Sequence, residues 1–522
     1  MEKIKRLTIL LSSFSIFANA QITFQKTFGS TGYESAYACC QTDDGGYIAS
    51  GISFTLGAGY ADIYLIKTDS NGDLSCTKTY GGSDNDEIES MQPTSDGGFI
   101  LAGFTQSYGA GSRDVLLVKI DSVGNLLWSK TYGGSGYEYA SDVGQTSDGG
   151  YILVGYTTSL GPSNGNVYLI KTDANGDSLW IKTFASNNSY EFHSVEQTTD
   201  GGYVLAGSVN SFLASSNDFC IIKCDAAGNV TWMKRIGGPD NENAFYAIQT
   251  NDGGFIISGG TISFGVGMSD ALLVKIDSIG TVTWAKTYGG VNNESIQFIQ
   301  QTNDQGYILT GLTNASASTS DVLLIKTDSV GNLMWTKSYG GPDIEYGDCV
   351  KQTNDNGYII AGSFGFNLPD MCLIKTDANG NSGCNDSSLV FGITQTSLYD
   401  TSFIPTTYYG GMISSPVMVS GTGGSETTIC TSVGMNEDLQ KHAFKVFPNP
   451  FTDEIKISWQ NNTEQVILTI QNTLGETVFS AKENENSGNN MKIIDLRFLS
   501  EGVYFIEMII DGELTVRKIV KE

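Results

Sequence analysis

Short apolar runs rich in β-branched and aromatic residues alternate along most of the chain with turns made of Gly, Asp and Asn. Strong β formers bounded by such turn residues are the sequence pattern of antiparallel strands. No segment repeats its apolar residues with the 3.6-residue period of a helix. The pattern therefore predicts an all-β chain. Within one representative stretch the predicted strands are 139–145, 151–155, 166–171 and 178–184.

This four-strand pattern repeats along the chain with a nearly constant period. The phrase Gln-Thr-x-Asp-Gly-Gly-(Tyr/Phe), here called the turn phrase, recurs seven times with small variations and places its Asp at Asp44, Asp96, Asp148, Asp200, Asp252, Asp304 and Asp355. The phrase (Ile/Val)-Lys-x-Asp-x-x-Gly, here called the lysine phrase, keeps pace, with its Lys at Lys67, Lys119, Lys171, Lys223, Lys275, Lys326 and Lys375. Periods of 20–50 residues mark arrays of similar units, and four short strands per unit are typical of propeller blades. We therefore expect a seven-bladed β-propeller over residues 21–384.

The first predicted strand belongs to the last repeat. Residues 24–29 copy the fourth-strand phrase found at 128–133, yet they precede the first full repeat. The seventh repeat, in contrast, lacks a good fourth strand where it reaches Cys384. We therefore expect the strand at 22–28 to complete the seventh blade, which would close the ring and remove its open sheet edges.

The beginning of the chain and its charge indicate an exported protein. Residues 1–20 combine a basic start, an apolar run and an Ala-Asn-Ala site, which is the pattern of a secretory signal peptide. No later apolar run is long enough for a transmembrane helix. The formal charge of −27 argues against nucleic acid and anionic lipid as partners. With His193 and His442 as the two histidines, histidine-based metal sites and Ser-His-Asp triads are nearly excluded.

Acidic residues recur at the loop-rich face that the propeller would present. Ten residues before the turn-phrase Asp, six repeats carry a carboxylate, a set here called the acidic ring: Glu34, Asp86, Glu138, Glu242, Glu294 and Glu345. Carboxylates gathered near a central channel could hold Ca²⁺ or a cationic ligand. The competing interpretation is structural, because a repeated structural role needs one copy in every blade.

A second set of positions in the inner strand differs from repeat to repeat. The position seven residues before the turn-phrase Asp is occupied, in order of the repeats, by Tyr37, Glu89, Ser141, His193, Phe245, Gln297 and Asp348. Such a varied set could line a channel with a specific ligand, or it could reflect drift at positions that face solvent. We expect His193 to be a polar wall residue and not a catalytic base.

The segment after the repeats, residues 385–443, is rich in Ser, Thr and Gly and is interpreted as a linker or an extension. Cys384 and Cys430 flank most of it and are predicted to form a disulfide, which export would permit. The competing interpretation is two free thiols. The nine cysteines form no CxxC pair, so a zinc site is not expected.

From residue 444 the chain again reads as short strands separated by turn residues, which predicts a small Ig-like β-sandwich. Its ordered markers are Pro448-Asn449-Pro450, Leu474-Gly475, Gly502-Val503-Tyr504 and Lys518 to Lys521. With these markers, residues 444–522 resemble the C-terminal sorting domain of type IX secretion cargo. The resemblance implies recognition by the outer-membrane translocon and sorting machinery, and a secreted or cell-surface protein of a Gram-negative bacterium. The competing interpretation is an ordinary stability module.

The repeats at 22–384 resemble a broad class of exported bacterial repeat proteins with QTxDGGYIxxG and LIKTDxxGNxxW phrases. This resemblance implies a fold but no particular chemistry.

Three functions of the protein stay open. The leading one is a non-catalytic propeller that binds a glycan or a surface protein at its loop-rich face. The others are a polysaccharide hydrolase that uses two channel carboxylates as acid and base, and a structural adhesin. An enzyme should break the repeat with one unusual carboxylate pair, and the acidic ring shows no such break.

Overall fold

The computed structural model describes residues 21–521 apart from 162–164, 186–188, 211–215, 315–318, 366–367, 390, 397, 403–405, 410–411, 415–417, 422–424, 435–444, 449–450, 462–464, 473–476, 485–487, 501 and 511–512. The predicted signal peptide lies outside the described residues. The described chain falls into two compact units, one ending at Gly434 and the other covering the C-terminal residues from 435. All regular elements of the described residues are β-strands, as the sequence predicts.

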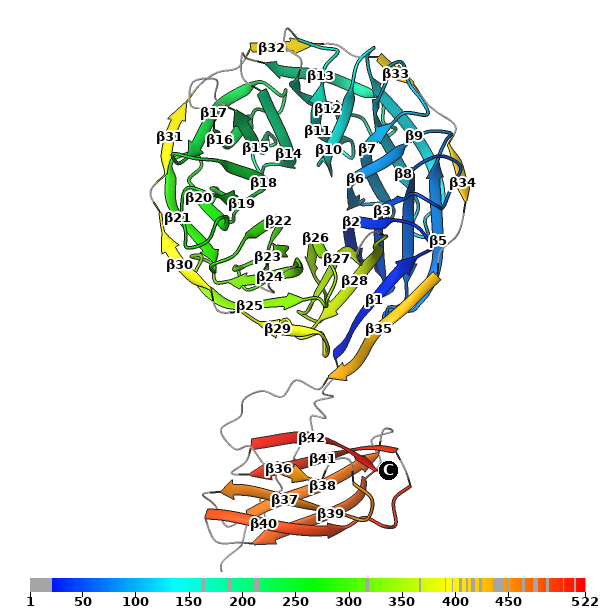
Figure 1. The fold of residues 1–522 in the computed structure, drawn as a ribbon, viewed down its shortest axis with the longest axis vertical. Coiled ribbons are helices and arrows are strands. Elements are labelled where there is room, and N and C mark those ends of the chain that lie inside the picture. The colour runs from blue at the N-terminus through cyan, green and yellow to red at the C-terminus, as the bar shows by residue number, and fades with distance from the viewer. Residues whose placement is uncertain are drawn as a thin grey trace, which may run out of the picture. The chain divides into compact units, whose positions relative to one another are not determined.

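The first unit consists of small antiparallel sheets placed around a central opening (Figure 1). Six of these sheets take four strands each from one repeat, and the first strand of the repeat lies innermost. The first sheet contains β2 (Glu34–Gln41), β3 (Tyr47–Ser53), β4 (Asp62–Thr68) and β5 (Leu74–Gly81). The second contains β6 (Asp86–Pro93), β7 (Phe99–Thr105), β8 (Asp114–Ile120) and β9 (Leu126–Gly133). The third contains β10 (Glu138–Gln145), β11 (Tyr151–Thr157), β12 (Asn166–Thr172) and β13 (Ser178–Ala185).

The next three sheets repeat this order. They are β14 (Ser189–Gln197), β15 (Tyr203–Asn210), β16 (Asn217–Cys224) and β17 (Val230–Gly237); β18 (Glu242–Gln249), β19 (Phe255–Thr261), β20 (Asp270–Ile276) and β21 (Val282–Gly289); and β22 (Glu294–Gln301), β23 (Tyr307–Thr313), β24 (Asp321–Thr327) and β25 (Leu333–Tyr339).

The sheet of the last repeat contains the first strand of the chain. Its own strands are β26 (Glu345–Gln352), β27 (Tyr358–Phe364) and β28 (Asp370–Thr376), and β1 (Gln21–Gly29) pairs antiparallel with β28 in the register Thr27↔Cys372. The strand predicted at 22–28 therefore takes the fourth position of the seventh sheet. This pairing covers the edge that β28 would otherwise expose.

The segment predicted as a linker or extension adds a fifth, outermost strand to every one of these sheets. Its strands are β29 (Asp386–Ser388), β30 (Gly392–Gln395), β31 (Tyr399–Ser402), β32 (Thr406–Tyr409), β33 (Met412–Ser414), β34 (Val419–Gly421) and β35 (Ser425–Gly434). In this order they pair with β25, β21, β17, β13, β9, β5 and β1, so the segment runs around the outside of the unit against the direction of the repeats (Figure 1). The first unit thus continues past the predicted boundary at residue 384 to Gly434, because each sheet still had an unpaired outer edge.

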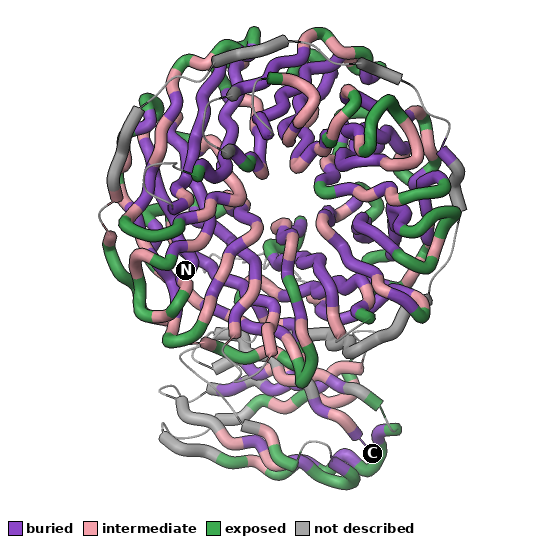
Figure 2. The backbone as a smooth tube through the Cα atoms, turned by 45° about the horizontal axis from the view of Figure 1, so that its top comes forward, coloured by how far each residue is buried: buried purple, intermediate pink, exposed green. Residues whose placement is uncertain are grey.

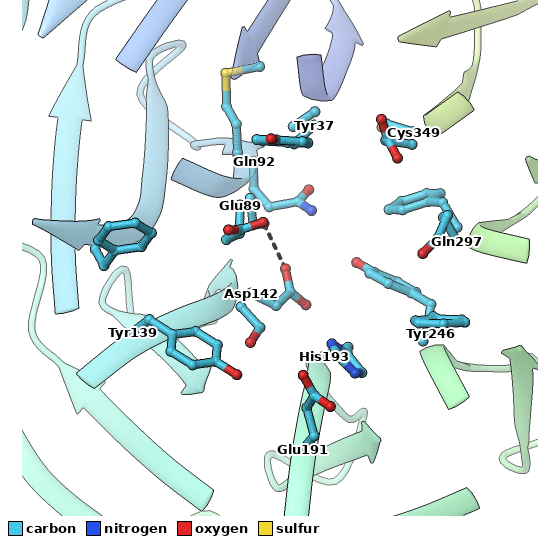
Figure 3. A pocket seen from close by; sticks show the side chains of 18 of the residues that line it. Tyr37, Glu89, Gln92, Tyr139, Asp142, Glu191, His193, Tyr246, Gln297 and Cys349 are labelled. Carbon is cyan, nitrogen blue, oxygen red and sulfur yellow. Dashed lines mark hydrogen bonds between the residues drawn. The ribbon is translucent and has the colours of Figure 1, made fainter. Parts of the chain in front are cut away.

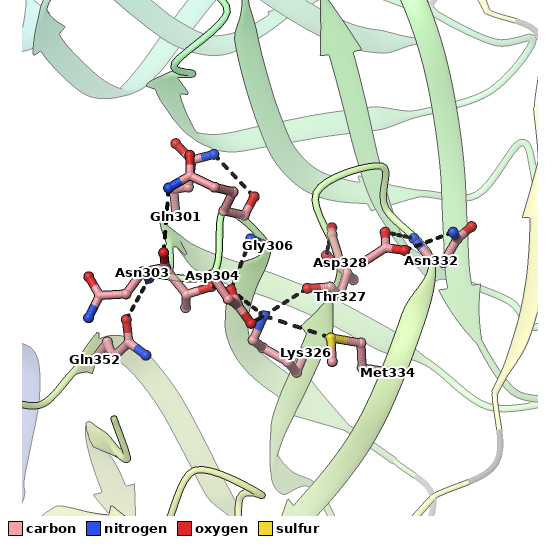
Figure 4. A network of polar contacts seen from close by, with 12 residues as sticks. Gln301, Asn303, Asp304, Gly306, Lys326, Thr327, Asp328, Asn332, Met334 and Gln352 are labelled. Atoms are coloured by element: carbon pink, nitrogen blue, oxygen red, sulfur yellow. Dashed lines mark hydrogen bonds and ion pairs between the residues drawn. The ribbon is translucent and has the colours of Figure 1, made fainter. Parts of the chain in front are cut away.

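The turn phrase and the lysine phrase are joined by an ion pair in every repeat. The pairs are Lys67–Asp44, Lys119–Asp96, Lys171–Asp148, Lys223–Asp200, Lys275–Asp252, Lys326–Asp304 and Lys375–Asp355. Figure 4 shows one copy, in which Lys326 Nζ also donates to the carbonyl of Thr327 at 2.8 Å. The two phrases keep the same spacing because they meet in space at one end of the sheet.

Neighbouring sheets are held together by apolar clusters and by tryptophans of the fourth strands, such as Trp180 of β13. Buried residues run along both faces of the sheets, whereas the turns are exposed (Figure 2). Trp180 of β13 meets Tyr203 of the next repeat with ring centroids 6.0 Å apart. A Cβ added to Gly228, in a turn of the same next repeat, would lie 2.6 Å from the Trp180 ring. Trp180 therefore packs between sheets.

The second unit is a separate pair of antiparallel sheets. One contains β36 (Lys445–Phe447), β37 (Glu454–Asn461) and β40 (Gly488–Asp495), and the other contains β38 (Gln465–Asn472), β39 (Thr477–Asn484), β41 (Gly502–Ile510) and β42 (Glu513–Lys521). Ile457, Leu468 and Ile506 are among the residues of their shared apolar core. None of the described residues forms a helix that is long and apolar enough to cross a membrane.

Candidate functional site: a cavity lined by bulge residues

Every innermost strand contains a β-bulge at the same position. In β10, Ala140 pairs with Gly155 and Asp142 pairs with Val154, so Ser141 has no partner in β11. The corresponding residues in the other inner strands are skipped in the same way, and the set, here called the bulge residues, is Tyr37, Glu89, Ser141, His193, Phe245, Gln297 and Asp348. Bulges redirect a side chain and are common next to active sites.

A glycine of the repeat makes room for each bulge. A Cβ added to Gly155 would lie 1.9 Å from the carbonyl oxygen of Tyr139, and the equivalent Gly207 and Gly311 meet the same obstacle at 2.1 and 1.9 Å. These glycines follow the turn phrase at a fixed distance. The sequence therefore carried a signal for the bulges, although the bulges themselves were not predicted.

All seven bulge residues line one cavity of about 500 Å³ (Figure 3). A volume of this size is typical of small-molecule sites, which range from roughly 300 to 1,000 Å³. The positions that vary between repeats thus face a shared space. This favours the interpretation of a specific channel over that of drift.

The cavity wall has two carboxylates of nearby inner strands on one side and paired aromatic rings on the other, where Glu191 also lies beside His193. Asp348, Tyr37 and Glu89 come from three consecutive inner strands, β26, β2 and β6. His193 and Phe245 come from β14 and β18, farther around the ring (Figure 1), and their ring centroids are 5.4 Å apart.

Tyr246 and Phe298 extend the aromatic side, with ring centroids 4.4 Å apart. In Figure 3, Tyr37 and Glu89 lie on one side of the cavity, and His193 and Tyr246 lie on the other. The repeat has therefore built a wall whose two sides differ in chemistry.

Glu89 and Asp348 are held in a protein environment that disfavours their charge. Glu89 is exposed to the cavity but surrounded by protein, and this desolvation, with repulsion from Glu87, raises its pKa to about 7 although Arg113 opposes the rise. Desolvation, with repulsion from Cys349 and Glu89, raises the pKa of Asp348 to about 7. Strongly shifted carboxylates in a cavity are candidates for functional groups.

The cations that line the cavity lie on aromatic rings. Lys351 Nζ is 4.5 Å from the centroid of the Phe298 ring. The guanidinium carbon of Arg113 is 3.6 Å from the centroid of the Phe104 ring, and its Nε has no hydrogen-bond partner among the described residues. Neither forms an ion pair with a cavity carboxylate in the described part of the chain.

Asp142, next to a bulge residue, has a structural role that the sequence did not reveal. It accepts hydrogen bonds from Ser90 Oγ at 2.7 Å and from the backbone N–H of Val195 and Val143 at 2.9 Å each, and thereby links three consecutive repeats. Desolvation raises the pKa of Asp142 to about 6, although these hydrogen bonds act to lower it. The sequence signal for Asp142 is weak, because the other repeats carry no Asp at this position.

The acidic ring predicted from the sequence is bonded locally. Glu138 accepts hydrogen bonds from Thr157 Oγ1 and from the backbone N–H of Gly134, at 2.8 Å each. Equivalent bonds from a hydroxyl and a backbone N–H reach Glu34, Asp86, Glu242 and Glu294. These contacts favour the structural interpretation of the ring.

Glu345 departs from this pattern. Phe364 stands opposite it in place of the hydroxyl residue, its Oε2 has no hydrogen-bond partner in the described chain, and desolvation raises its pKa to about 7. Among the described residues no three His, Cys, Asp or Glu side chains are grouped to hold a metal ion. Calcium binding at the ring stays a prediction.

The predicted disulfide and sorting residues are described in part. Cys384 is disulfide-bonded, but the side chain of Cys430 lies outside the described residues, so their pairing stays a prediction. Seven other cysteines are free.

Among the predicted sorting residues, Asn449, Pro450 and the side chain of Lys518 lie outside the described residues. Of the other sorting markers, Pro448 is exposed, Gly502 begins β41, Tyr504 Oη donates to Ser500 O at 2.9 Å, and Lys521 Nζ donates to Leu496 O at 2.7 Å.

Comparison with known proteins bears on the second unit. Residues 445–522 match the family model of the secretion system C-terminal sorting domain. The match indicates export by type IX secretion, interaction with that machinery, and a secreted or cell-surface location in bacteria of the Bacteroidetes type. This agrees with the resemblance found in the sequence.

Comparison over the whole chain adds little. No curated protein matches it. Among solved structures, it is similar to PorZ, an essential bacterial surface component of the type-IX secretion system of Porphyromonas gingivalis, with 8% identity, 96% of this chain and 100% of that chain covered, and a TM-score of 0.16. A likeness with so low a TM-score carries no argument.

Proposed function

We propose that this exported protein is a non-catalytic binding protein of the cell surface or medium, and that its ligand occupies the central cavity. The observation that carries the proposal is the set of bulge residues. Seven nearly identical repeats place seven different side chains around one cavity, and variation on a constant scaffold is where binding sites are usually found. The ligand would be a small molecule or the end of a glycan or surface protein.

The scaffold of this function is a seven-bladed β-propeller closed by β1. Contacts between the first and last repeats support the closure: Cys39 Sγ donates to Ile359 O at 3.7 Å, and Cys349 Sγ donates to Cys39 O at 3.7 Å. Deletion of residues 21–29 would leave β35 without a partner strand and would expose the outer edge of β28. We expect a sharp fall in Tm that an added peptide of residues 21–29 partly restores, and an unchanged Tm would contradict the closure.

Ligand binding is tested with the mature protein, residues 21–522. We expect at least one member of a panel of glycans and small metabolites to raise its Tm and to give saturable heat in calorimetry. Phe245→Ala, which removes a cavity wall, should abolish both effects. Asp84→Asn, at an exposed loop position, is the matched control and should leave them unchanged. Failure of the whole panel, or binding that Phe245→Ala leaves intact, would contradict the proposal.

A hydrolase that acts on polysaccharide is the second candidate. The observation that favours it is the pair Glu89 and Asp348, both with a pKa of about 7, since a general acid works best with a pKa near the working pH. Release of reducing ends from a polysaccharide, lost in Glu89→Gln, would establish it. Absence of release from substrates that bind would leave non-catalytic binding as the function.

Export is carried by the second unit. We expect a chain that ends at Gly434 to remain in the periplasm of a type IX host, and residues 435–522 to carry a periplasmic reporter to the surface or medium. Surface delivery of the shortened chain would mean that residues 445–522 act as an ordinary stability module.

A further inference from the structure

The cavity contains two carboxylates that form no ion pair with the protein's own cations. Neither Glu89 nor Asp348 has an ion pair or a side-chain hydrogen bond among the described residues, whereas all seven turn-phrase aspartates are paired with a lysine. Burying a carboxylate without a partner is costly. The two carboxylates flank Tyr37 in neighbouring inner strands and raise each other's energy through repulsion, so a cation between them would relieve that cost.

The protein's own cations are poorly placed to fill this role. Lys351 and Arg113 lie over the Phe298 and Phe104 rings and form no ion pair with Glu89 or Asp348. Across the cavity from Glu89 and Asp348, Phe245 and Tyr246 offer flat aromatic faces, and Glu191 lies beside His193 (Figure 3). Aromatic faces attract organic cations as well as apolar groups.

We propose that the cavity binds a small organic cation, with its ammonium group toward Glu89 and Asp348 and a flat or apolar body against Phe245 and Tyr246. The proposal rests on the proposed function, that the cavity binds a ligand. A cavity of about 500 Å³ accommodates a small molecule of this kind. A bare divalent ion fits less well, because Ca²⁺ takes six to eight oxygen ligands. Of the other carboxylates that line the cavity, Asp142 is already bonded to Ser90, Val143 and Val195, and no three acidic, Cys or His side chains of the described residues are grouped to hold a metal ion.

The test compares three probes of nearly the same shape on the mature protein. They are phenethylamine, 2-phenylethanol and phenylacetate, which differ in charge. We expect phenethylamine to bind at least about tenfold more tightly than the alcohol, since a cation gains both carboxylate and ring contacts, and phenylacetate to give no binding. Equal affinity for amine and alcohol, or tighter binding of phenylacetate, would overturn the proposal.

Variants assign the binding to the two sides of the wall. Glu89→Gln with Asp348→Asn should reduce amine affinity to that of the alcohol and leave alcohol affinity unchanged. Phe245→Ala should weaken both probes. Asp84→Asn is the control for loss of one acidic residue outside the cavity, and circular dichroism confirms that each variant folds. Amine binding unaffected by the double variant would overturn the proposal.

The pH dependence gives an independent readout. Glu87 and Arg113 lie beside Glu89, Cys349 follows Asp348 in β26, and Tyr37 lies on β2 between the two strands. The other titratable groups of the wall include Asp142, Glu191, His193 and Lys351. A cation favours the ionised carboxylates, so amine affinity should rise from about pH 6 to pH 8, with proton release seen as buffer-dependent heat. The double variant should remove most of this rise, and an equal rise in the variant would overturn the assignment to Glu89 and Asp348.

Failure of this proposal differs from failure of the proposed function. If a neutral saccharide from the panel binds and Phe245→Ala abolishes that binding, while the amine does not bind, the cation proposal is wrong and the cavity remains a ligand site. If neither the panel nor the three probes bind, both are wrong.

Discussion

The backbone N–H of Asn354 donates a hydrogen bond of 2.8 Å to the side-chain oxygen of Gln41, 313 residues earlier in the chain. The same contact joins successive repeats, for example from Ser95 to Gln145 at 2.7 Å. The junction between the last and the first repeat therefore uses the contact of the internal junctions. This equivalence makes the closure of the ring testable by single substitutions.

Gln41→Ala and Gln145→Ala form a matched pair for that test. Each removes a side-chain acceptor from a backbone N–H at a junction, which costs about 0.5–1.5 kcal/mol. We expect the two variants to lower the free energy of unfolding by similar amounts in chemical denaturation. A loss for Gln145→Ala with none for Gln41→Ala would indicate that the first and last repeats are not joined in solution.

Two glycines of one repeat separate backbone strain from packing between sheets. Gly201 and Gly228 have φ angles of +80° and +73°, but a Cβ at Gly201 would have no heavy atom within 4 Å, whereas one at Gly228 would lie 2.6 Å from the Trp180 ring. Gly201→Ala should cost about 1–2 kcal/mol for the left-handed conformation. Gly228→Ala should cost a further ~1–3 kcal/mol because the ring must move. Equal losses in thermal or urea unfolding would mean that Trp180 does not pack on this turn.

The turn-phrase aspartates predict acid sensitivity. Burial would raise the pKa of Asp148, but hydrogen bonds from Thr146 and Lys171 outweigh it and hold the pKa at about 2, below the ordinary value near 3.9. A lowered folded-state pKa contributes stability that is full above about pH 4 and is lost as the pH falls toward 2. Urea midpoints measured from pH 5 to pH 2 should therefore fall steadily. Asp148→Asn should make that fall shallower, and an unchanged slope would contradict the assignment.

The cavity carboxylates predict the opposite pH effect. The pKa of Glu89 and of Asp348 is raised to about 7, so the protonated forms favour folding and stability declines as the pH rises from about 4 through 7. Glu89→Gln with Asp348→Asn should raise Tm at pH 8 and leave it nearly unchanged at pH 4. Asp84→Asn serves as the control. A Tm gain of the same size at both pH values would indicate that charge in the cavity is not its cause.

Cys384 and Cys430 are expected to form the disulfide that closes the outer segment onto the first strand. The side-chain amide of Gln25 donates to Cys384 O at 2.5 Å, and the Gln25 backbone pairs with Cys430 in β35, so the backbones of both cysteines lie beside one residue. Non-reducing peptide mapping should recover one peptide pair joined through these two cysteines. Recovery of Cys430 as a free thiol would contradict the pairing.

The local phrases of the sequence determined the strands, the turns and the place of β1 in the sheet of the last repeat. Each phrase acts over a short distance: the turn phrase closes a hairpin, the lysine phrase supplies the partner of its Asp, and Trp180 covers the next sheet. Such contacts repeat with the period of the sequence, so each repeat forms its own hairpins without help from distant parts of the chain. The ordered markers after residue 444 likewise predicted the sorting domain that the family model matches.

Tertiary structure decided the outer strands and the chemistry of the cavity. The segment after residue 384 has weak strand patterning, and its strands form because the sheets offer unpaired outer edges that are distant in sequence. For Ser141 and its equivalents the sequence left open a specific channel or drift, because the glycines that accompany the bulges do not show which space the bulged side chains face. Glu89 and Asp348 are far apart in the chain. The two carboxylates repel each other because the sheets bring their strands to the same side of one cavity.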